Sequence, residues 1–276
     1  MKSVALLTLV ILGSVFAIPS PNPPQDIPRP DIPPPEIELN AVDSHAPVLG
    51  IIPVDTYLYW IAKVYPVESL IENLEDSIAG AQRRLTKIFH LTTTEDIPRG
   101  TPCADITVLF ARGIKEDGNL GALVGPAFVN AIRKKAGNRT VAVQGTNYPS
   151  TIQGYLQGGD PFGGRRMTID VRYHLIRCPK TKLVMSGYSN GALIVRNSAT
   201  VLTDLTMRKV SSVVLFGDPR YPEPVPNVSN SKLLNICHNG DSVCRLGSNM
   251  VLLSHFLYVR DVEKAAEFVI SRLGDS

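Results

Sequence analysis

Short apolar runs and longer segments with helical periodicity alternate along the chain from residue 105 onwards. Helix-length segments occupy 120–136, 163–177, 190–206 and 262–273. The apolar runs predict buried parallel strands, because each is short and almost free of charge. They are "DITVLFA" (105–111), "TVAVQG" (140–145), "KLVMSG" (182–187), "SVVLFG" (212–217) and "KLLNIC" (232–237). This alternation predicts an α/β fold, an α/β/α sandwich around a five-stranded parallel sheet.

A different pattern precedes the alternation, in "PVESLIENLEDSIAGAQRRLTKIF" (66–89). Apolar residues recur there at helical spacing and would form one stripe, which predicts an amphipathic helix. The stripe contains Val67, Leu70, Ile71, Leu74, Ile78, Leu85 and Ile88. We expect it to pack on the main body of the protein. The alternative is a pro-segment that is removed by cleavage after Arg83 and Arg84.

The N-terminal residues predict export followed by a tail. Residues 1–17, "MKSVALLTLVILGSVFA", have a lysine, an apolar stretch too short to span a bilayer and a small residue at the expected cleavage site, as in a signal peptide. Residues 18–53 are so rich in proline that they predict a disordered leader. We expect residues 54–100 to form an N-terminal extension and 101–276 the main domain. A secreted, extracellular protein with no stable membrane anchor is predicted.

Composition and charge narrow the class of protein. The chain has 276 residues, 44% of them hydrophobic and 19% charged, which is enough to fill one substantial core. The net charge of +3 is small and its basic residues are dispersed, so no nucleic-acid surface is expected. We predict a monomer.

The four cysteines favour disulfides in an exported protein, because the C-x-x-C pairs typical of zinc sites are absent. Four cysteines allow three pairings. Cys237 and Cys244 are close enough in sequence to close a short loop, which leaves Cys103 to pair with Cys178. The sequons at Asn138 and Asn227 predict glycosylation on the surface.

A serine lies between two glycines where a predicted strand meets a predicted helix, in "GYSNG" (187–191). Glycines on either side of such a turn let the strand and the helix pack closely. In the G-x-S-x-G elbow of α/β-hydrolases the serine sits on this strained turn with its hydroxyl exposed, and the next N–H can bind an oxyanion. The motif makes Ser189 a candidate nucleophile that needs a base and an acid.

Chain order selects these partners, because α/β-hydrolases present the nucleophile, the acid and the histidine in that sequence. Only His238 and His255 follow Ser189. His255 lies in a loop before the last predicted helix, where the base belongs, so we favour it. Asp218 and Asp241 compete for the acid. Asp241 follows the second strand after the elbow, in a loop that the cysteines could clamp, and Asp218 before a proline is typical of an Asx turn.

These three side chains predict a serine esterase. His255 would remove the proton from Ser189 as it attacks an ester carbonyl, and Asp241 would hold the imidazole. This chemistry requires neither a metal nor a cofactor.

Three longer runs resemble the cutinase family, which also contains acetylxylan esterases. They are "CADITVLFARGIKEDGNLGALVGPAF" (103–128), "CPKTKLVMSGYSNGA" (178–192) and "CHNGDSVCRLGSNMVLLSHFLYVRD" (237–261). The resemblance covers about 103–273 and implies a minimal α/β-hydrolase fold. It implies the same triad and the same disulfides, and an oxyanion hole made by the backbone N–H groups of Ile114 and Asn190.

The chain departs from the family pattern at both oxyanion positions. The family usually has Gln where this chain has Asn190, a mild change because the backbone N–H is the donor. The family has Ser or Thr where this chain has Ile114, so a hydroxyl that could also donate is missing.

The residues before the predicted base indicate the substrate class. The run before His255 is apolar, and we expect Val251, Leu252 and Leu253 to line a groove for acyl chains. We therefore favour a cutin-like polyester or a short-chain lipid ester over acetylated xylan. A hypothesis of another class is a weakly active or non-catalytic surface-binding protein, for which Ile114 is the one supporting feature.

Overall fold

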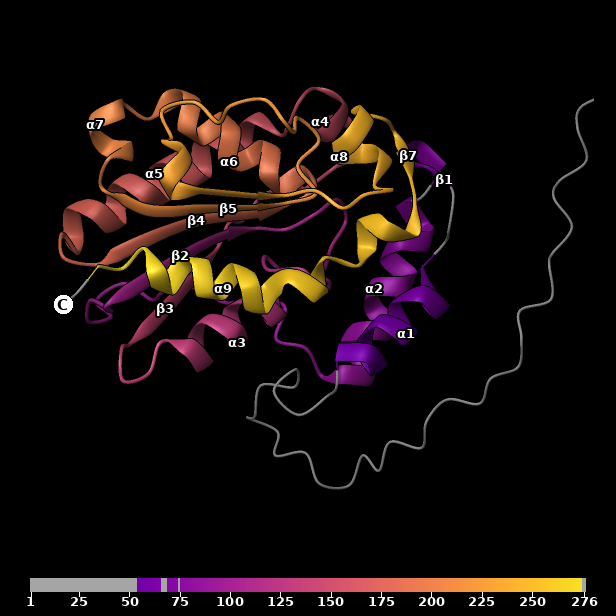
Figure 1. Cartoon of the computed structure of the whole chain (residues 1–276). Coiled ribbons are helices and arrows are strands. Elements are labelled where there is room, and N and C mark those ends of the chain that lie inside the picture. The colour runs from indigo at the N-terminus through magenta and orange to yellow at the C-terminus, as the bar shows by residue number, and fades with distance from the viewer. Residues whose placement is uncertain (1–53, 66–68, 74, 275–276) are drawn as a thin grey trace, which may run out of the picture. The chain divides into compact units, whose positions relative to one another are not determined.

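A parallel sheet of five strands forms the centre of the protein (Figure 1). The computed structural model describes residues 54–65, 69–73 and 75–274, which belong to one compact unit. In the order β3-β2-β4-β5-β6, each strand is parallel to its neighbours. The strands are β2 (Ile106–Ala111), β3 (Val141–Gly145), β4 (Lys182–Tyr188), β5 (Val210–Phe216) and β6 (Leu233–Ile236). The predicted sheet is confirmed.

Helices cover both faces of this sheet, so the predicted α/β/α sandwich is also confirmed (Figure 1). On one face α5 (Pro161–Arg177) packs against α6 (Asn190–Val201), and on the other α3 (Gly125–Lys135) packs against α9 (Val262–Ser271). Shorter helical elements connect the strands and helices. They are α4 (Ile152–Leu156), α7 (Asp204–Met207), η4 (Asn230–Lys232), α8 (Ser242–Leu246), η5 (Leu253–Phe256) and η6 (Tyr258–Asp261).

The strands are mostly apolar because helices cover both of their faces. Side chains of β2 alternate between two hydrophobic clusters, with Val108 and Phe110 on the side of α3 and α9, and Leu109 and Ala111 on the side of α5 and α6. A strand with one solvated face would have shown alternating polar residues instead.

The predicted helix at 66–89 is wrong in its first part. The structure places α1 at Val54–Val64, a short strand β1 at Ser69–Leu70, a 3-10 turn η3 at Ile71–Asn73, and α2 only at Glu75–Phe89. β1 pairs antiparallel with β7 (Met250–Val251), and this pairing takes the chain out of the helical path. Leu70, which was expected on the apolar stripe, is consequently exposed.

The apolar side of α2 packs on the main body, as expected for the stripe. Ile78, Leu85 and Phe89 are buried in the same hydrophobic cluster as the residues of β2 and α3. The helix α1 was not predicted, and its Tyr57 and Ile61 join this cluster.

Two other predicted helices are shorter in the structure for local reasons. The segment 120–136 is helical only from Gly125, with a proline in its first turn. The segment 190–206 ends at Val201, and Thr203 then caps α7 by accepting a hydrogen bond from the Thr206 N–H. The predicted signal peptide and leader lie outside the described residues, and the domain boundaries stay predictions.

Candidate active site

Ser189 lies on the turn between β4 and α6, at the carboxyl end of a central strand. Its φ of 54° is in the left-handed region, where a serine is strained. A Cβ at Gly187 would lie 2.2 Å from the Gly191 oxygen, and a Cβ at Gly191 would lie 1.9 Å from the Ala111 oxygen. Both positions therefore require glycine, because α6 approaches β2 and β4 too closely for a side chain.

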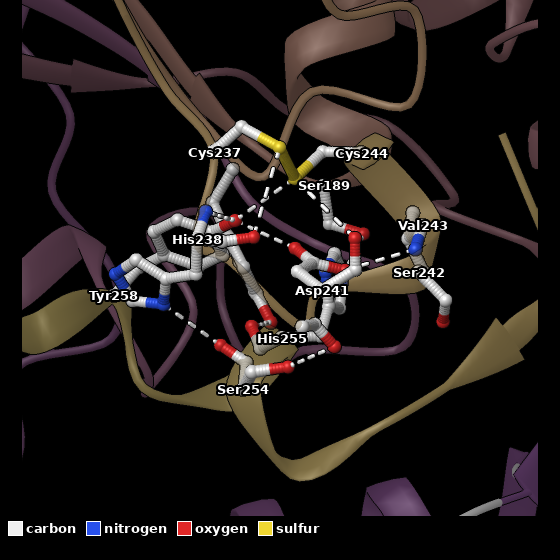
Figure 2. A network of polar contacts seen from close by, with 12 residues as sticks. Ser189, Cys237, His238, Asp241, Ser242, Val243, Cys244, Ser254, His255 and Tyr258 are labelled. Atoms are coloured by element: carbon white, nitrogen blue, oxygen red, sulfur yellow. Dashed lines mark hydrogen bonds and ion pairs between the residues drawn. A yellow bond between two sulfur atoms is a disulfide. The ribbon is translucent and has the colours of Figure 1, made fainter. Parts of the chain in front are cut away.

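Ser189, His255 and Asp241 form a continuous chain of hydrogen bonds (Figure 2). The Nε2 atom of His255 is 2.9 Å from Ser189 Oγ, and its Nδ1 atom is 2.8 Å from Asp241 Oδ2. A carboxylate can only accept a hydrogen bond, so Nδ1 carries the proton and Nε2 accepts from the serine hydroxyl. The structure thus brings together the three residues that the sequence predicts as a triad.

Three different elements supply these groups, and all three side chains are buried. Ser189 directly precedes α6, the Asp241 side chain caps the start of α8, and His255 lies in η5. The serine is only 5% exposed.

Asp241 is held from several sides. Its Oδ1 accepts the Val243 N–H at 2.9 Å, and its Oδ2 accepts the Tyr258 hydroxyl at 2.6 Å in addition to His255. Burial favours the neutral acid, but the charge and hydrogen bond of His255 and the two other donors outweigh it and lower the pKa of Asp241. The carboxylate form is therefore the stable one.

Both disulfides pair as predicted, Cys103 with Cys178 and Cys237 with Cys244. The second bond closes the loop that carries Asp241, as Figure 2 shows. The Cys237–Cys244 disulfide therefore restrains the loop that positions Asp241.

The competing acid, Asp218, is bound to Arg196 instead of His255. Arg196 Nη2 lies 2.6 Å from Asp218 Oδ2, and both side chains are almost completely buried. Asp218 Oδ1 also accepts the Arg220 N–H at 3.1 Å, which is the turn contact expected for an Asp before a proline.

The competing histidine, His238, belongs to a second pair. Its Nε2 lies 2.6 Å from Asp261 Oδ2, and its Nδ1 lies 3.0 Å from the Ser254 oxygen. Its ring stacks on Tyr258 with 4.0 Å between the ring centroids. Burial lowers the pKa of His238, but the two acceptors outweigh burial and raise it.

The two expected oxyanion donors are both next to the serine. Asn190 follows Ser189 directly, and Ile114 lines the same small cavity as Ser189. Neither backbone N–H donates to a backbone acceptor among the described residues. Both groups therefore remain candidates for binding an oxyanion.

The cavity at Ser189 is lined mainly by apolar side chains, some of them from the N-terminal segment that contains α1, β1, η3 and α2, which we call the covering segment. Ile71 of η3 and both Ile78 and Gln82 of α2 contribute to its lining. The remaining lining residues are Ile114, Glu116, Leu123, Tyr188, Val251, His255 and Phe256. Of the three predicted groove residues only Val251 lines the cavity, whereas Leu252 and Leu253 do not.

Sequence reasoning missed Tyr258, Glu116 and the covering helix as parts of this site. The H-x-x-Y spacing, which puts Tyr258 three residues after His255, was a usable signal. Helical periodicity showed that α2 has an apolar face, but it could not show that this face lies over the serine.

The two predicted glycosylation sites differ in the structure. Asn138 is exposed in a turn. The Nδ2 atom of Asn227, to which a glycan would be joined, donates to the Ala199 and Leu202 oxygens instead. The first site is therefore better suited to modification than the second.

No group of three or more potential metal ligands occurs within the described ranges. Over the same ranges, no helix has both the length and the apolarity that crossing a membrane requires.

Comparison with known proteins gives matches that cover most of the chain. A family model described as Cutinase matches residues 102–273. The cutinase of Hypocrea jecorina strain QM6a is 38% identical over 270 residues, which is 98% of each chain. The cutinase of Botryotinia fuckeliana is 45% identical over 172 residues, which is 62% of this chain and 85% of that protein.

Among solved structures, Trichoderma reesei cutinase in complex with a C11Y4 phosphonate inhibitor matches with a TM-score of 0.68 and 38% identity. The match covers 80% of this chain and all of that one. A cutinase-like protein from Cryptococcus shares the fold, with a TM-score of 0.51 and 18% identity over 62% of this chain and 96% of that one.

Proposed function

The chain belongs to the cutinase family and is a carboxylic ester hydrolase, and we propose that Ser189 is its nucleophile, His255 its general base and Asp241 the acid that orients the base. The observation that carries this proposal is the hydrogen-bonded chain itself. The contacts from Ser189 Oγ to His255 Nε2 and from His255 Nδ1 to Asp241 Oδ2, at 2.9 and 2.8 Å, have the geometry that proton transfer requires.

The reaction proceeds in two halves. Ser189 Oγ attacks the ester carbonyl while its proton moves to His255 Nε2, and Asp241 stabilises the imidazolium. The tetrahedral intermediate collapses when that proton passes to the leaving alkoxide, so an alcohol departs and an acyl-serine remains. Water then gives a proton to His255 and attacks the acyl-serine, which releases the acid and restores the hydroxyl.

The negative charge of each tetrahedral intermediate lies on the former carbonyl oxygen. We propose that the backbone N–H groups of Ile114 and Asn190 bind this oxygen. A hydroxyl at position 114 would add a third donor, and one such donor contributes about 3 kcal/mol in other hydrolases. Ile114 cannot supply it, so the rate is expected to rest on two N–H donors.

The substrate class that fits best is a cutin-like polyester or a short-chain lipid ester. The apolar side chains around Ser189 favour an acyl chain, and the similarity to cutinases over nearly the whole chain supports the same choice. Acetylated xylan is the second candidate. It would need polar groups or an aromatic platform beside the serine, and the single tryptophan, Trp60, is in α1 instead.

We propose that the covering segment moves when an ester reaches the serine. Ile71, Ile78 and Gln82 line the small cavity beside the serine, which is itself only 5% exposed. We therefore include displacement of η3 and α2 as the step that precedes binding.

Secretion is part of the proposal and rests on two features. The first 17 residues resemble a signal peptide. The two disulfides need an oxidising compartment to form and persist.

The deciding experiment compares the purified protein with its Ser189→Ala variant on 4-nitrophenyl butyrate. We expect the variant to lose at least about 10⁴-fold in kcat. A phosphonate should block the wild-type protein with one equivalent bound and leave the variant unlabelled. Equal rates for the two proteins would contradict the triad and would favour the surface-binding alternative.

A further inference from the structure

Glu116 is a buried carboxylate that the proposed reaction does not use. Its side chain is 5% exposed, and none of the ion pairs between described residues includes it. A buried charge without a cation is unfavourable unless hydrogen bonds compensate for the lost water. Burial raises the pKa of Glu116, although the hydrogen bonds that it accepts oppose this.

Three of those hydrogen bonds come from the backbone of one loop. Glu116 Oε2 accepts the Gly113 N–H at 2.7 Å, and Oε1 accepts the N–H groups of Ala122 and Leu123, each at 2.9 Å. A single carboxylate thus ties the beginning of the segment 113–123 to its end. Gly113 immediately precedes Ile114, whose N–H is one of the two proposed oxyanion donors.

The loop is also shaped to hold this carboxylate. At Gly121, with a φ of 77°, a Cβ would lie 2.4 Å from the Cδ and Oε2 atoms of Glu116. A side chain at that position would displace the carboxylate. The fourth contact comes from the covering helix, where Gln82 Nε2 donates to Oε1 at 3.2 Å. All four neighbours donate to the two carboxyl oxygens, so the side chain acts here as an acceptor.

We propose that Glu116 is a positioning residue that fixes the loop 113–123 so that the Ile114 N–H binds the oxyanion. The role rests on the proposed function, because it acts on a donor of that site. Glu116 does not touch the reacting atoms. It determines where Ile114 lies by holding the residue before it and the two residues that close the loop.

The test is Glu116→Gln, which keeps the size of the side chain but presents an NH₂ group to one of the N–H donors. We expect kcat on 4-nitrophenyl butyrate, measured per serine titrated with a phosphonate, to fall about 10- to 100-fold, with KM within about threefold. The corresponding thionoester should lose less, because its sulfur accepts hydrogen bonds poorly and gains little from the oxyanion donors. The ratio of oxoester to thionoester rates should therefore fall.

Asp170→Asn is the matched control, because it neutralises another buried carboxylate, on α5, that does not line the cavity. It should leave both the rate per titrated serine and the ratio unchanged. If Glu116→Gln yields little folded protein, Gly121→Ala displaces the same carboxylate, and the ratio is measured on its folded fraction. An unchanged ratio in the variant that folds would overturn the proposal.

Ser189→Ala separates this proposal from the proposed function. An active Ser189→Ala variant would overturn the triad and the oxyanion role together. An inactive Ser189→Ala variant beside a Glu116→Gln variant with normal kcat and a normal ratio would overturn only the role of Glu116.

Discussion

Tyr258 gives the carboxylate of Asp241 a hydrogen bond on the same oxygen that faces His255. Its hydroxyl lies 2.6 Å from Asp241 Oδ2 and also accepts the His238 N–H at 3.1 Å. Burial keeps the phenol neutral by raising its pKa, so it remains a donor throughout the working pH range. Because Tyr258 donates to this oxygen, the Asp241 carboxylate stabilises the imidazolium of His255 less strongly. The same hydrogen bond fixes the orientation of the carboxylate.

Tyr258→Phe should therefore change the pH profile and not only the rate. Without the hydroxyl, Asp241 stabilises the imidazolium more strongly, so the acidic limb of kcat/KM should move to higher pH by up to about one unit. The plateau should fall several-fold because the carboxylate is less well oriented. Tyr188→Phe is the matched control, since its hydroxyl donates to the His255 backbone oxygen at 2.8 Å and not to the carboxylate. A fall in rate with no movement of the limb would contradict the role of Tyr258.

His238 makes stability depend on pH. Both of its ring nitrogens face acceptors, Asp261 and the Ser254 oxygen, which only the imidazolium can satisfy together. Its folded pKa is raised above 6.5, so its contribution is complete below pH 6.5 and is lost as the pH rises through the folded pKa. We expect urea unfolding to show a loss from His238→Gln that is larger at pH 5.5 than at pH 9, by on the order of 1 kcal/mol. An equal loss of unfolding free energy at both pH values would refute the role of protonated His238 in stability.

At the scale of the elements, the covering segment contains an unfavourable buried group, the hydroxyl of Tyr65. This residue follows α1, is 1% exposed and packs on Phe256 with 4.6 Å between the ring centroids. Its hydroxyl has no hydrogen-bond partner among the described residues. A buried hydroxyl without a partner costs about 1 to 3 kcal/mol, so the closed arrangement is less stable than its apolar packing alone would make it.

Tyr65→Phe should consequently stabilise the closed form and slow the enzyme. A gain of about 1 kcal/mol should raise Tm by about 2 to 4 °C. If the cover must open before the ester binds, the same gain should lower kcat/KM on a soluble ester about fivefold. Tyr57→Phe is the control, and its Tm should change in the opposite direction. The Tyr57 hydroxyl donates to the Ala122 oxygen, so its loss should lower Tm. A higher Tm for Tyr65→Phe with an unchanged rate would show that the serine is reached without moving this segment.

The strands and the chemistry of the site could be predicted from the sequence because both are encoded locally. The buried strands are short apolar runs, and Ser189 and Asp241 lie on motifs whose spacing fixes the turn or the loop. The covering segment could not be predicted in the same way, since Leu70 fits a helical stripe but pairs in space with Met250 of β7. Glu116 was missed for a related reason, because its role comes from a loop that folds back on it.

For the whole molecule, α1 and α2 are part of the core and not an attachment to it. Tyr57, Ile61, Leu85 and Phe89 are almost completely buried and join the cluster that also contains Phe110 and Phe128. Each such side chain contributes about 1.5 to 3 kcal/mol through burial, and their sum is comparable to the net stability of a domain. Arg83 and Arg84 are exposed on α2, so a protease could reach them there, but removing the segment would uncover this cluster.

Two deletions separate the predicted leader from this segment. Removing residues 18–53, which lack a hydrophobic pattern in the sequence, should leave Tm and kcat on 4-nitrophenyl butyrate close to the full-length values. Removing residues 18–89 should abolish folding, seen as a lost thermal transition and precipitation, because the buried aromatic contacts of α1 and α2 disappear with it. The prediction fails if the shorter chain folds and turns over a soluble ester faster than the full chain. That result would favour the alternative of a pro-segment that is removed by cleavage after Arg83 and Arg84.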